Sequence, residues 1–378
     1  QIYDPTLFSS STHSKLKTHH STAMVLKVGI LGGANIANKI SRAINSIPDV
    51  AQVVVVGSRE ASKAAAFIER NKLVHASPVA GYDAVLDFPG VEAVYIPLPT
   101  ALHVEWVQKA ASKGLHIVLE KPIAIEDEHV DAIVKAAADA NVVLFDGTMW
   151  MHHPRTAAME AALQEIGPVW DVDSAFTFKG SADFLENNVR VKADGDPLGA
   201  LGDVGWYCVR AILWAYDFTP PTHVAAHHGA LFNEAGVPLN IAATLLFPGG
   251  RKARFLAAFD TVFTSKLEVY GDRGSLRLRD FVIPTAEHEA SFVVATANGL
   301  ADGDTRIATV EETRTVRNAV TQEAALWQRF AREIEVVRAG GRAPEYWPRI
   351  AALTERVLSA VLASARQGCA LLPFEHRA

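Results

Sequence analysis

Cysteine is scarce in this sequence of 378 residues, which contains only Cys208 and Cys369. Two cysteines so far apart exclude a disulfide framework, and we expect the chain to fold in a reducing compartment such as the cytoplasm. The sequence also lacks any apolar run near the ~20 residues that a membrane-spanning helix needs. It has no basic excess either, because 36 Lys and Arg face 42 Asp and Glu, for a formal net charge of −6. We therefore expect no membrane partner and no binding of nucleic acid through bulk charge.

Apolar residues are abundant, at 49% of the chain against 21% charged residues, so most of the sequence can form packed cores. The length predicts two domains, or three, at roughly 100–200 residues per domain. Residues 1–24 are different, because Ser, Thr, His and Lys dominate there without a periodic apolar pattern. We expect a disordered tail without chemistry, derived from upstream or added sequence. An organellar targeting peptide is the alternative, although residues 1–23 contain no Arg.

Residues 25–148 alternate between short apolar runs and segments with helical spacing. The runs predicted as strands are residues 28–31, 53–56, 91–96, 116–120 and 142–145. Between the first two runs, Ile36, Ile40 and Ile44 repeat at the spacing of one helix face. Strands that alternate with helices in this way predict right-handed βαβ units. The expected fold class is therefore α/β, with a Rossmann-type doubly wound parallel sheet.

Residues 149–378 show a different pattern. Strands are predicted at residues 169–178, 242–247, 253–259, 266–270 and 275–278, and helices at residues 202–216, 322–338 and 347–367. These elements predict an α+β domain for substrate binding and dimerisation, with a mainly antiparallel open sheet covered by helices on one face. Phe255, Ala257 and Phe259 share a strand face for which too few helices remain, so we expect a homodimer formed sheet to sheet. Loops such as residues 281–300 are the alternative cover for this face.

A glycine-rich turn follows the first predicted strand and precedes the first helix. The segment Gly32-Gly33-Ala34-Asn35-Ile36-Ala37 is a degenerate dinucleotide fingerprint, because alanine stands where the second and third glycines are usual. Alanine still lets the backbone approach a pyrophosphate, and the helix N-terminus offers amide donors. A Gly-Gly turn alone is often just a turn, but its position between strand and helix favours a dinucleotide site.

The end of the second predicted strand favours NADP over NAD. An NAD site usually places Asp or Glu there to bind the ribose 2′-hydroxyl, whereas this chain has Ser58 and Arg59. A hydroxyl and a guanidinium suit a 2′-phosphate. A solvated surface side chain is the alternative interpretation of Arg59, and NAD is the second choice of cofactor.

Three polar side chains are candidates for proton chemistry. Lys121 lies between Glu120 and Pro122 at a strand end, where a Lys-Pro turn with an expected cis bond would direct its ammonium into the cleft. Asp203 and Tyr207 are four residues apart, so they share one helix face. An ammonium beside the phenol would lower its pKa and make Tyr207 a proton donor and acceptor for an alcohol–carbonyl pair. Taken singly, Tyr207 is better explained as a core aromatic residue, and Asp203 as a carboxylate that stabilises a helix N-terminus.

Motifs spread over most of the chain occur together. They are the glycine-rich turn, Pro97-x-Pro-x-x-x-His103, the Glu-Lys-Pro element within residues 114–122, and the Asp-x-x-x-Tyr element within residues 198–208. In this combination the sequence resembles the glucose–fructose oxidoreductase/inositol dehydrogenase/MocA-like (Gfo/Idh/MocA) family. The resemblance covers about residues 25–370. It is closest to the branch of dimeric dihydrodiol dehydrogenases and NADP xylose dehydrogenases, which includes uncharacterised plant members.

The resemblance implies roles for individual residues. Lys121 would contact the nicotinamide ribose and a substrate hydroxyl, Asp203 would hold the substrate, and Tyr207 would be the acid–base residue, as in the dihydrodiol branch. Trp150 and Arg190 would lie near the substrate, although residues 150–154 depart from the family's usual Arg-Phe-x-Pro element. Cofactor contacts are expected from residues at the strand ends, namely Gly32, Ala34, Asn35, Ile36, Ser58, Arg59, Leu98, Pro99, Thr100, His103, Glu120 and Lys121.

These expectations combine into one function. We expect an NADP-dependent oxidoreductase that moves hydride between nicotinamide and a small polyhydroxylated substrate, namely a sugar, polyol or trans-dihydrodiol. Tyr207 and Lys121 would handle the hydroxyl proton. The alternative is a non-catalytic dinucleotide-binding sensor on the same fold. No metal site is expected, because the adjacent histidines at 152–153 and 227–228 would point to opposite strand faces.

Overall fold

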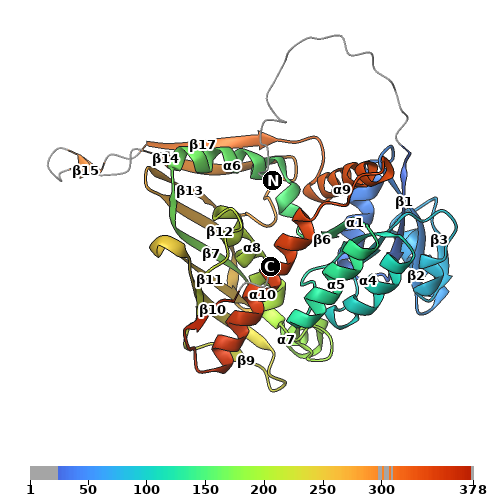
Figure 1. Cartoon of the computed structure of the whole chain (residues 1–378), viewed down its shortest axis with the longest axis horizontal. Helices are drawn as coiled ribbons and strands as arrows, with labels where there is room; N and C mark the ends of the chain where they lie inside the picture. The colour runs from blue at the N-terminus through green and yellow to red at the C-terminus, as the bar shows by residue number, and fades with distance from the viewer. Residues whose placement is uncertain (1–23, 297–299, 302–305, 308–309, 376–378) are drawn as a thin grey trace, which may run out of the picture.

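The computed structural model describes residues 24–296, 300–301, 306–307 and 310–375, and its first sheet is entirely parallel (Figure 1). The strand order is β3-β2-β1-β4-β5-β6. The strands are β1 (Leu26–Leu31), β2 (Ala51–Ser58), β3 (Ser77–Ala80), β4 (Ala93–Ile96), β5 (His116–Leu119) and β6 (Leu144–Asp146). The helices between them are α1 (Asn35–Asn45), α2 (Ala61–Arg70), α3 (Asp83–Leu86), η2 (Thr100–Leu102), α4 (His103–Ser112) and α5 (Asp127–Asp139). The predicted doubly wound α/β fold is confirmed, and the expected tail at residues 1–23 lies outside the described residues.

The central strands of this sheet read as continuous apolar runs because helices cover both of their faces. Every residue of β4 and β5 is buried. Strand β3 was not predicted, since none of its four residues is buried and it carries no apolar run. The sequence signal therefore marks the centre of the sheet and fades at its edge.

The second sheet has ten strands and is mostly antiparallel, as predicted. Its order is β17-β14-β13-β12-β7-β11-β10-β8-β18, with β9 beside β10 and with β7 parallel to β11. The strands are β7 (Val169–Lys179), β8 (His223–Ala226), β9 (Leu231–Phe232), β10 (Pro238–Leu246), β11 (Lys252–Ala258), β12 (Asp260–Gly271), β13 (Gly274–Leu278), β14 (Glu289–Thr296), β17 (Val310–Arg317) and β18 (Leu372–Pro373). Strands β15 (Leu300–Ala301) and β16 (Arg306–Ile307) form a separate pair.

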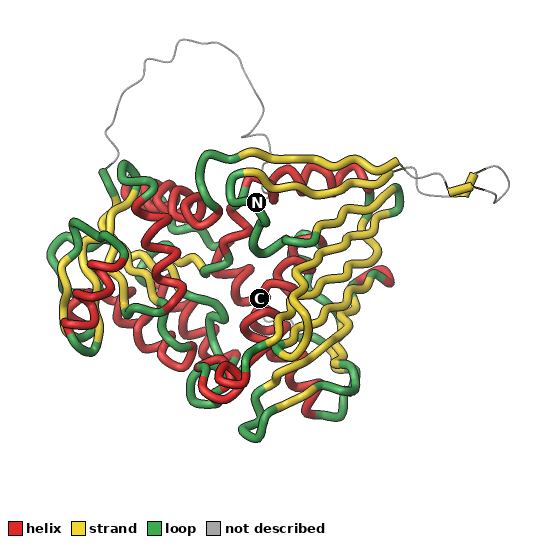
Figure 2. The backbone as a smooth tube through the Cα atoms, turned by 180° about the vertical axis from the view of Figure 1, so that it is seen from behind, coloured by secondary structure: helices red, strands yellow, loops and turns green. Residues whose placement is uncertain are grey.

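Helices of the second half lie largely between the two large sheets, as Figure 2 shows. They are η3 (Met149–His152), α6 (Pro154–Ile166), α7 (Ala182–Asn187), η4 (Val189–Val191), the π-helical turn η5 (Leu201–Gly205), α8 (Trp206–Ala215), η6 (Pro248–Gly250), α9 (Gln322–Arg338) and α10 (Tyr346–Arg366). Helix α9 was predicted at its exact bounds, whereas α6 was not predicted. Helix α10 contacts α5 and β6 on one side and α8 and β8 on the other, so it joins the two halves.

The expectation of an uncovered face at Phe255, Ala257 and Phe259 is wrong. All three side chains are at most 2% exposed within a single chain. The turn η5 and helix α8 contact β11 from this side, and the ring of Phe259 packs against Phe178 and Phe184. One helix lying across several strands covers more of the sheet than the sequence count suggested.

A buried polar network fixes α8 against the end of β6. Arg210, fully buried on α8, donates from Nη2 to Asp146 Oδ2 at 3.0 Å and from Nε to Thr354 Oγ1 on α10 at 2.8 Å. Trp206 Nε1 donates to Thr148 Oγ1 at 2.7 Å, and Thr148 lies two residues beyond the end of β6. The helix that carries Tyr207 is thus held both by the parallel sheet, through these contacts, and by the ten-stranded sheet on which it packs.

Candidate active site

A cleft of about 550 Å³ opens where the carboxyl ends of the parallel strands face η5 and β7. This is the edge at which doubly wound sheets bind their ligands. The sequence-predicted residues that line it are Ala34, Asn35, Ile36, Leu98, Pro99, Thr100, Glu120, Lys121, Arg190, Asp203 and Tyr207. Residues from both halves of the chain therefore meet in one cavity.

The floor of the cleft at the first strand end suits a phosphate group. Gly32 has φ +98°, a conformation that favours glycine, and lets the chain turn sharply from β1 into α1. Helix α1 has Ala34 at its N-cap position, so it has no side-chain cap, and its first turn holds no acidic residue. Its first amide groups are free to donate to an anion, and the positive end of the helix dipole adds to the attraction. The residues present therefore fit the pyrophosphate of a dinucleotide.

Ser58 and Arg59 lie at the neighbouring strand end, where β2 finishes. Arg59 is exposed and Ser58 is half-buried, and neither contributes to the lining of the cleft itself. A dinucleotide that crosses from the α1 N-terminus toward β2 would bring its adenosine ribose to this edge. The structure places both side chains at the end of β2, and their contact with a 2′-phosphate stays a prediction.

The segment after β4 contributes backbone and one hydroxyl to the cleft wall. Thr100 donates to Asp196 Oδ1 from both its amide, at 3.0 Å, and its hydroxyl, at 2.5 Å. This contact ties residues 182–200 of the second half to the parallel sheet, a link that no sequence signal indicated.

His103 does not line the cleft. It is 1% exposed, and its Nε2 and Nδ1 lie 2.9 Å and 3.1 Å from the carbonyl oxygens of Leu98 and Ile123. Burial lowers the pKa of the imidazole, so the ring is neutral and donates to one of these oxygens at a time. His103 thus joins the loops after β4 and β5, a positioning role in place of the expected cofactor contact.

Glu120 pairs with Tyr95 at the bottom of the cleft. The Tyr95 hydroxyl donates to Glu120 Oε1 at 2.5 Å. Burial raises the pKa of Glu120 above its usual value. Burial and the charge of Glu120 raise the pKa of Tyr95 well above its usual value. Gly147 leaves the space for this carboxylate, since a Cβ there would lie 2.9 Å from Glu120 Oε1. Tyr95 was not among the predicted site residues, because its position in a buried strand gives no sign of function.

Lys121 and Asp203 form the central ion pair of the cleft. The Lys121 ammonium lies 2.5 Å from Asp203 Oδ1 and 3.0 Å from the Asp203 carbonyl oxygen, and the bond between Lys121 and Pro122 is cis, as expected. Arg190 Nε lies 3.0 Å from the same Asp203 oxygen. Burial by itself would raise the pKa of Asp203, but the two cations outweigh it and lower the pKa to about 2. Asp203 is therefore a fixed anion that orients both cations.

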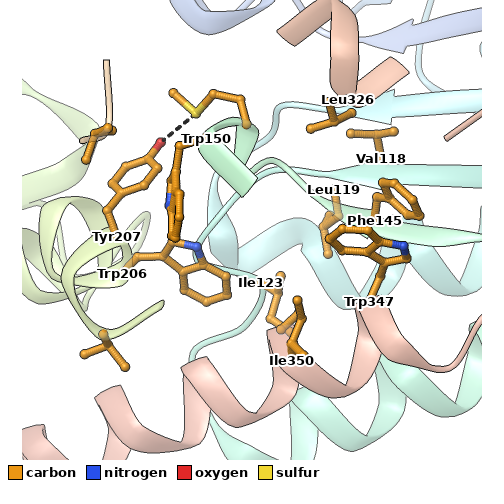
Figure 3. Close-up of a cluster of buried hydrophobic side chains, with 14 of the residues drawn as sticks. Val118, Leu119, Ile123, Phe145, Trp150, Trp206, Tyr207, Leu326, Trp347 and Ile350 are labelled. Atoms are coloured by element: carbon orange, nitrogen blue, oxygen red, sulfur yellow. Dashed lines mark hydrogen bonds between the residues drawn. The ribbon is translucent and has the colours of Figure 1, made fainter. Parts of the chain in front are cut away.

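Tyr207 stands one turn beyond Asp203, at the junction of η5 and α8. A π-helical turn of this kind is frequent at functional sites. The Lys121 ammonium lies 5.0 Å from the centre of the phenol ring, and the hydroxyl is 3.7 Å from Met149 Sδ (Figure 3). The expectation that Lys121 lowers the phenol pKa is wrong. Burial raises the pKa well above its usual value, the nearby charges of Glu120 and Asp203 add to this effect, and the opposing charge of Arg190 does not offset them.

Trp150 lies in the core and not in the cleft. Its side chain is 1% exposed and packs edge to face against Trp214 and Phe281, at 5.8 Å and 6.2 Å between ring centres. The expected substrate contact is thus replaced by packing, and the neighbouring Met149 is the residue of this segment that lines the cleft. An aromatic residue after a strand end gives the same sequence signal in either case.

Sequence reasoning missed much of the apolar lining of the cleft. Phe176 and Phe178 on β7 point into it, together with Val282 and Ile283 from the loop before β14 and Leu326 on α9. These residues read as ordinary strand and helix apolar positions. They differ from other apolar core residues only in that their elements border the cleft, and this arrangement is set by the tertiary structure.

Across the described residues, no group of three or more His, Cys, Asp and Glu side chains is placed to hold a metal ion. No helix in the same residues is long and apolar enough to cross a membrane. His152 instead stacks between the rings of Phe145 and Trp347, 5.5 Å and 4.6 Å away, and burial lowers its pKa to about 3.

Comparison with known proteins places the two halves in one family. Residues 26–148 match the oxidoreductase family with an NAD-binding Rossmann fold, and residues 156–277 match the Gfo/Idh/MocA C-terminal domain. The chain is 30% identical over 351 residues to a D-xylose 1-dehydrogenase (NADP(+)) of Haloferax volcanii, covering 91% of this chain and 98% of that protein. It is 25% identical over 264 residues to a trans-1,2-dihydrobenzene-1,2-diol dehydrogenase of Xenopus laevis, covering 68% and 77%.

A solved structure agrees with these matches. A 3-ketoreductase from Actinomadura kijaniata, in complex with NADP and TDP-benzene, superposes with a TM-score of 0.76 at 25% identity, covering 90% of this chain and 98% of that chain. Both family models, the relatives and the fold point the same way. The chain belongs to the Gfo/Idh/MocA family of oxidoreductases.

Proposed function

We propose that this protein is an NADP-dependent oxidoreductase that transfers hydride between nicotinamide and a carbon of a small polyhydroxylated substrate, namely a sugar, polyol or trans-dihydrodiol. The observation that carries the proposal is the meeting of Lys121, Asp203 and Tyr207 in the same cleft as the uncapped N-terminus of α1. Relatives named for NADP, xylose and dihydrodiol support it.

The chain's own groups would hold the cofactor at two places. The free amides of the α1 N-terminus would bind the pyrophosphate, and Ser58 and Arg59 would bind the 2′-phosphate of NADP, with NAD as the weaker ligand. When bound, the nicotinamide supplies or accepts the hydride.

The proton would be handled by Tyr207. Because burial keeps its phenol neutral, Tyr207 is set to donate a proton to a carbonyl oxygen in the direction of reduction. The Lys121 ammonium, held by Asp203, donates a hydrogen bond to the same oxygen and favours the alkoxide-like charge that develops there. In the direction of oxidation the same two groups act in reverse.

We also propose that the protein is a cytoplasmic homodimer. Both cysteines are free thiols, which suits a reducing compartment. Tyr270, at 39% exposure, pairs with Asp171 of the Arg254–Asp171 ion pair on the ten-stranded sheet, and Trp170, at 50% exposure, adjoins them at a register irregularity of β7. Such a mixed surface suits contact with a second copy.

The proposal is tested with the purified protein in two steps. Calorimetry should show binding of NADP, and the near-ultraviolet absorbance of NADPH should change when a panel of aldoses, polyols and cyclic diols is added. Absence of NADP and NAD binding would end the proposal. Tight cofactor binding without turnover of any panel member would favour the sensor alternative instead.

A further inference from the structure

Charged and apolar side chains both line the cleft. Lys121, Asp203 and Arg190 form its polar floor beside Tyr207, and Phe176 and Phe178 of β7, with Val282 and Ile283, form an apolar wall. A small polyol that is bound in a cavity needs hydrogen-bonding groups of the protein around all of its hydroxyl groups. This wall offers no such partners, so the cavity distinguishes between the two ends of whatever it binds.

Apolar side chains continue from this wall to the mouth of the cleft. Val189, Ile283 and Phe263 are 39%, 46% and 62% exposed, and they come from η4, from the loop before β14 and from β12. We call these three residues the apolar lip. Single exposed apolar residues are common on proteins, but here Val189 and Ile283 line the cleft, and Phe263 packs against the lining residue Phe176. Exposed apolar residues gathered at a cleft in this way favour a binding surface.

The fold places Phe263 at this mouth through an irregularity in β12. Pairing with β7 shifts register between Asp260 and Thr264, so the intervening residues bulge from the ladder. Thr177 Oγ1 donates to the Val262 carbonyl oxygen at 2.6 Å and fixes the bulge. Bulges re-aim side chains beside active sites. Here the bulge brings the exposed ring of Phe263 against Phe176, which lines the cleft.

An unbroken series of rings connects the lip to the reacting group. Phe263 meets Phe176 edge to face at 6.1 Å and 84°, and Phe176 lies 5.7 Å from the ring of Tyr207. A ligand with its hydroxyl at Tyr207 and Lys121 would therefore extend along Phe176 onto the lip. The distance between polar floor and lip is spanned by two aromatic side chains.

We propose that the substrate of this site carries an aryl or cycloalkyl group next to its hydroxylated part, and that this apolar group lies on Phe263, Ile283 and Val189. The proposal rests on the proposed function, since it assigns one end of the same substrate. A free sugar would leave the lip in water, whereas burial of an apolar ring there is favourable at about 25 cal/mol per Å².

The test uses the NADP-loaded protein and two ligands that differ only in the apolar group, methyl β-D-glucoside and phenyl β-D-glucoside. Calorimetry should show phenyl glucoside binding about tenfold more tightly than methyl glucoside, as burial of part of a phenyl ring predicts. In Phe263→Ala the preference should fall to about threefold or less, while NADP affinity stays unchanged. Leu231→Ala, which removes an apolar side chain of 51% exposure on β9, is the matched control and should keep the full preference.

Each other outcome overturns a defined statement. Equal binding of the two glucosides by the wild-type protein would overturn the lip assignment and leave the proposed function standing. Failure of both glucosides and of the polyol panel to bind, with NADP still bound, would overturn the polyhydroxylated substrate class and the lip assignment with it. A retained preference in Phe263→Ala, combined with a fall in molar mass by light scattering, would show that a second copy of the chain covers the lip.

Discussion

At the scale of single residues, contacts between the side chains of the site fix the charge that each of them carries. Asp203 accepts from Lys121 and Arg190, and these two cations lower its pKa to about 2 against the opposing effect of burial. Lys121 consequently donates from a fixed position, and Tyr207 stays a neutral phenol. The sequence correctly predicted that Lys121, Asp203 and Tyr207 are neighbours, but the predicted direction of the Tyr207 pKa shift is wrong. Burial of the phenol is the largest cause of that direction, and the depth to which a helix side chain is buried between two domains is not visible in the sequence.

The choice of cofactor is a prediction at this same scale. Arg59→Asp should weaken NADP binding at least about tenfold more than NAD binding, because it removes a phosphate partner and adds a like charge. Calorimetric titrations with both cofactors measure the difference. Lys63→Asp reverses a charge on the neighbouring helix α2, at a side chain paired with Glu60, and should affect the two cofactors alike. Equal losses in Arg59→Asp would identify Arg59 as a surface residue.

At the scale of elements, α8 holds Tyr207 in place through buried polar contacts. The sequence predicted the helix but not its attachment, because Arg210, Asp146 and Thr354 are far apart along the chain and each is common on a protein surface. The π-helical start at residues 201–205 was likewise unpredicted, since a helical apolar pattern does not distinguish a wider turn from an ordinary one.

Removal of Arg210 should destabilise the protein strongly. Arg210→Met leaves Asp146 buried without its cation, which typically costs about 3–5 kcal/mol. Lys135→Met is the matched control, because its ion pair with Asp139 on helix α5 is exposed and such pairs contribute less than about 1 kcal/mol. Urea unfolding followed by tryptophan fluorescence gives both values. Similar losses in the two variants would contradict the account of the network.

The attachment of α10 predicts a dependence of stability on pH. Glu355 is fully buried, its Oε2 accepts from the Ala124 amide at 3.4 Å near the Lys121 turn, and burial raises its pKa to about 8. A raised carboxyl pKa gives stability that is complete below the unfolded value and is lost as pH rises toward the folded value. Between about pH 5 and about pH 8, the melting temperature of the wild type should therefore fall more steeply than that of Glu355→Gln. Parallel curves for the two proteins would refute this role of Glu355.

At the scale of the whole molecule, the sequence predicted both sheets and missed how they are covered. Continuous apolar runs identify β4 and β5, because both faces of these strands are buried. Alternation of apolar and polar residues identifies β7 and β11, because mainly one face of these strands is buried. The prediction failed where cover comes from distant segments, as at Phe255 beneath α8. It failed again at Trp150, whose environment is set by the packing of three elements.

The oligomeric state is the prediction that belongs to this scale. Light scattering at micromolar concentration should give about twice the chain mass of 40.8 kDa, because the ten-stranded sheet exposes Trp170 and Tyr270. Trp170→Lys should shift the mass toward one chain, since a charge would be buried in the contact. A mass of 40.8 kDa for the wild-type protein would refute the dimer.

The central claim is that Tyr207 moves the proton while hydride passes to or from the nicotinamide. Its most direct test is the steady-state rate of Tyr207→Phe with NADP and the best substrate of the panel, compared with Tyr270→Phe, which removes a phenol hydroxyl bonded to Glu268 outside the cleft. Loss of a general acid–base group predicts a fall in kcat of about 10²–10⁴-fold for Tyr207→Phe with unchanged NADP affinity, and no change for Tyr270→Phe. A kcat for Tyr207→Phe within about threefold of the wild type would contradict the account.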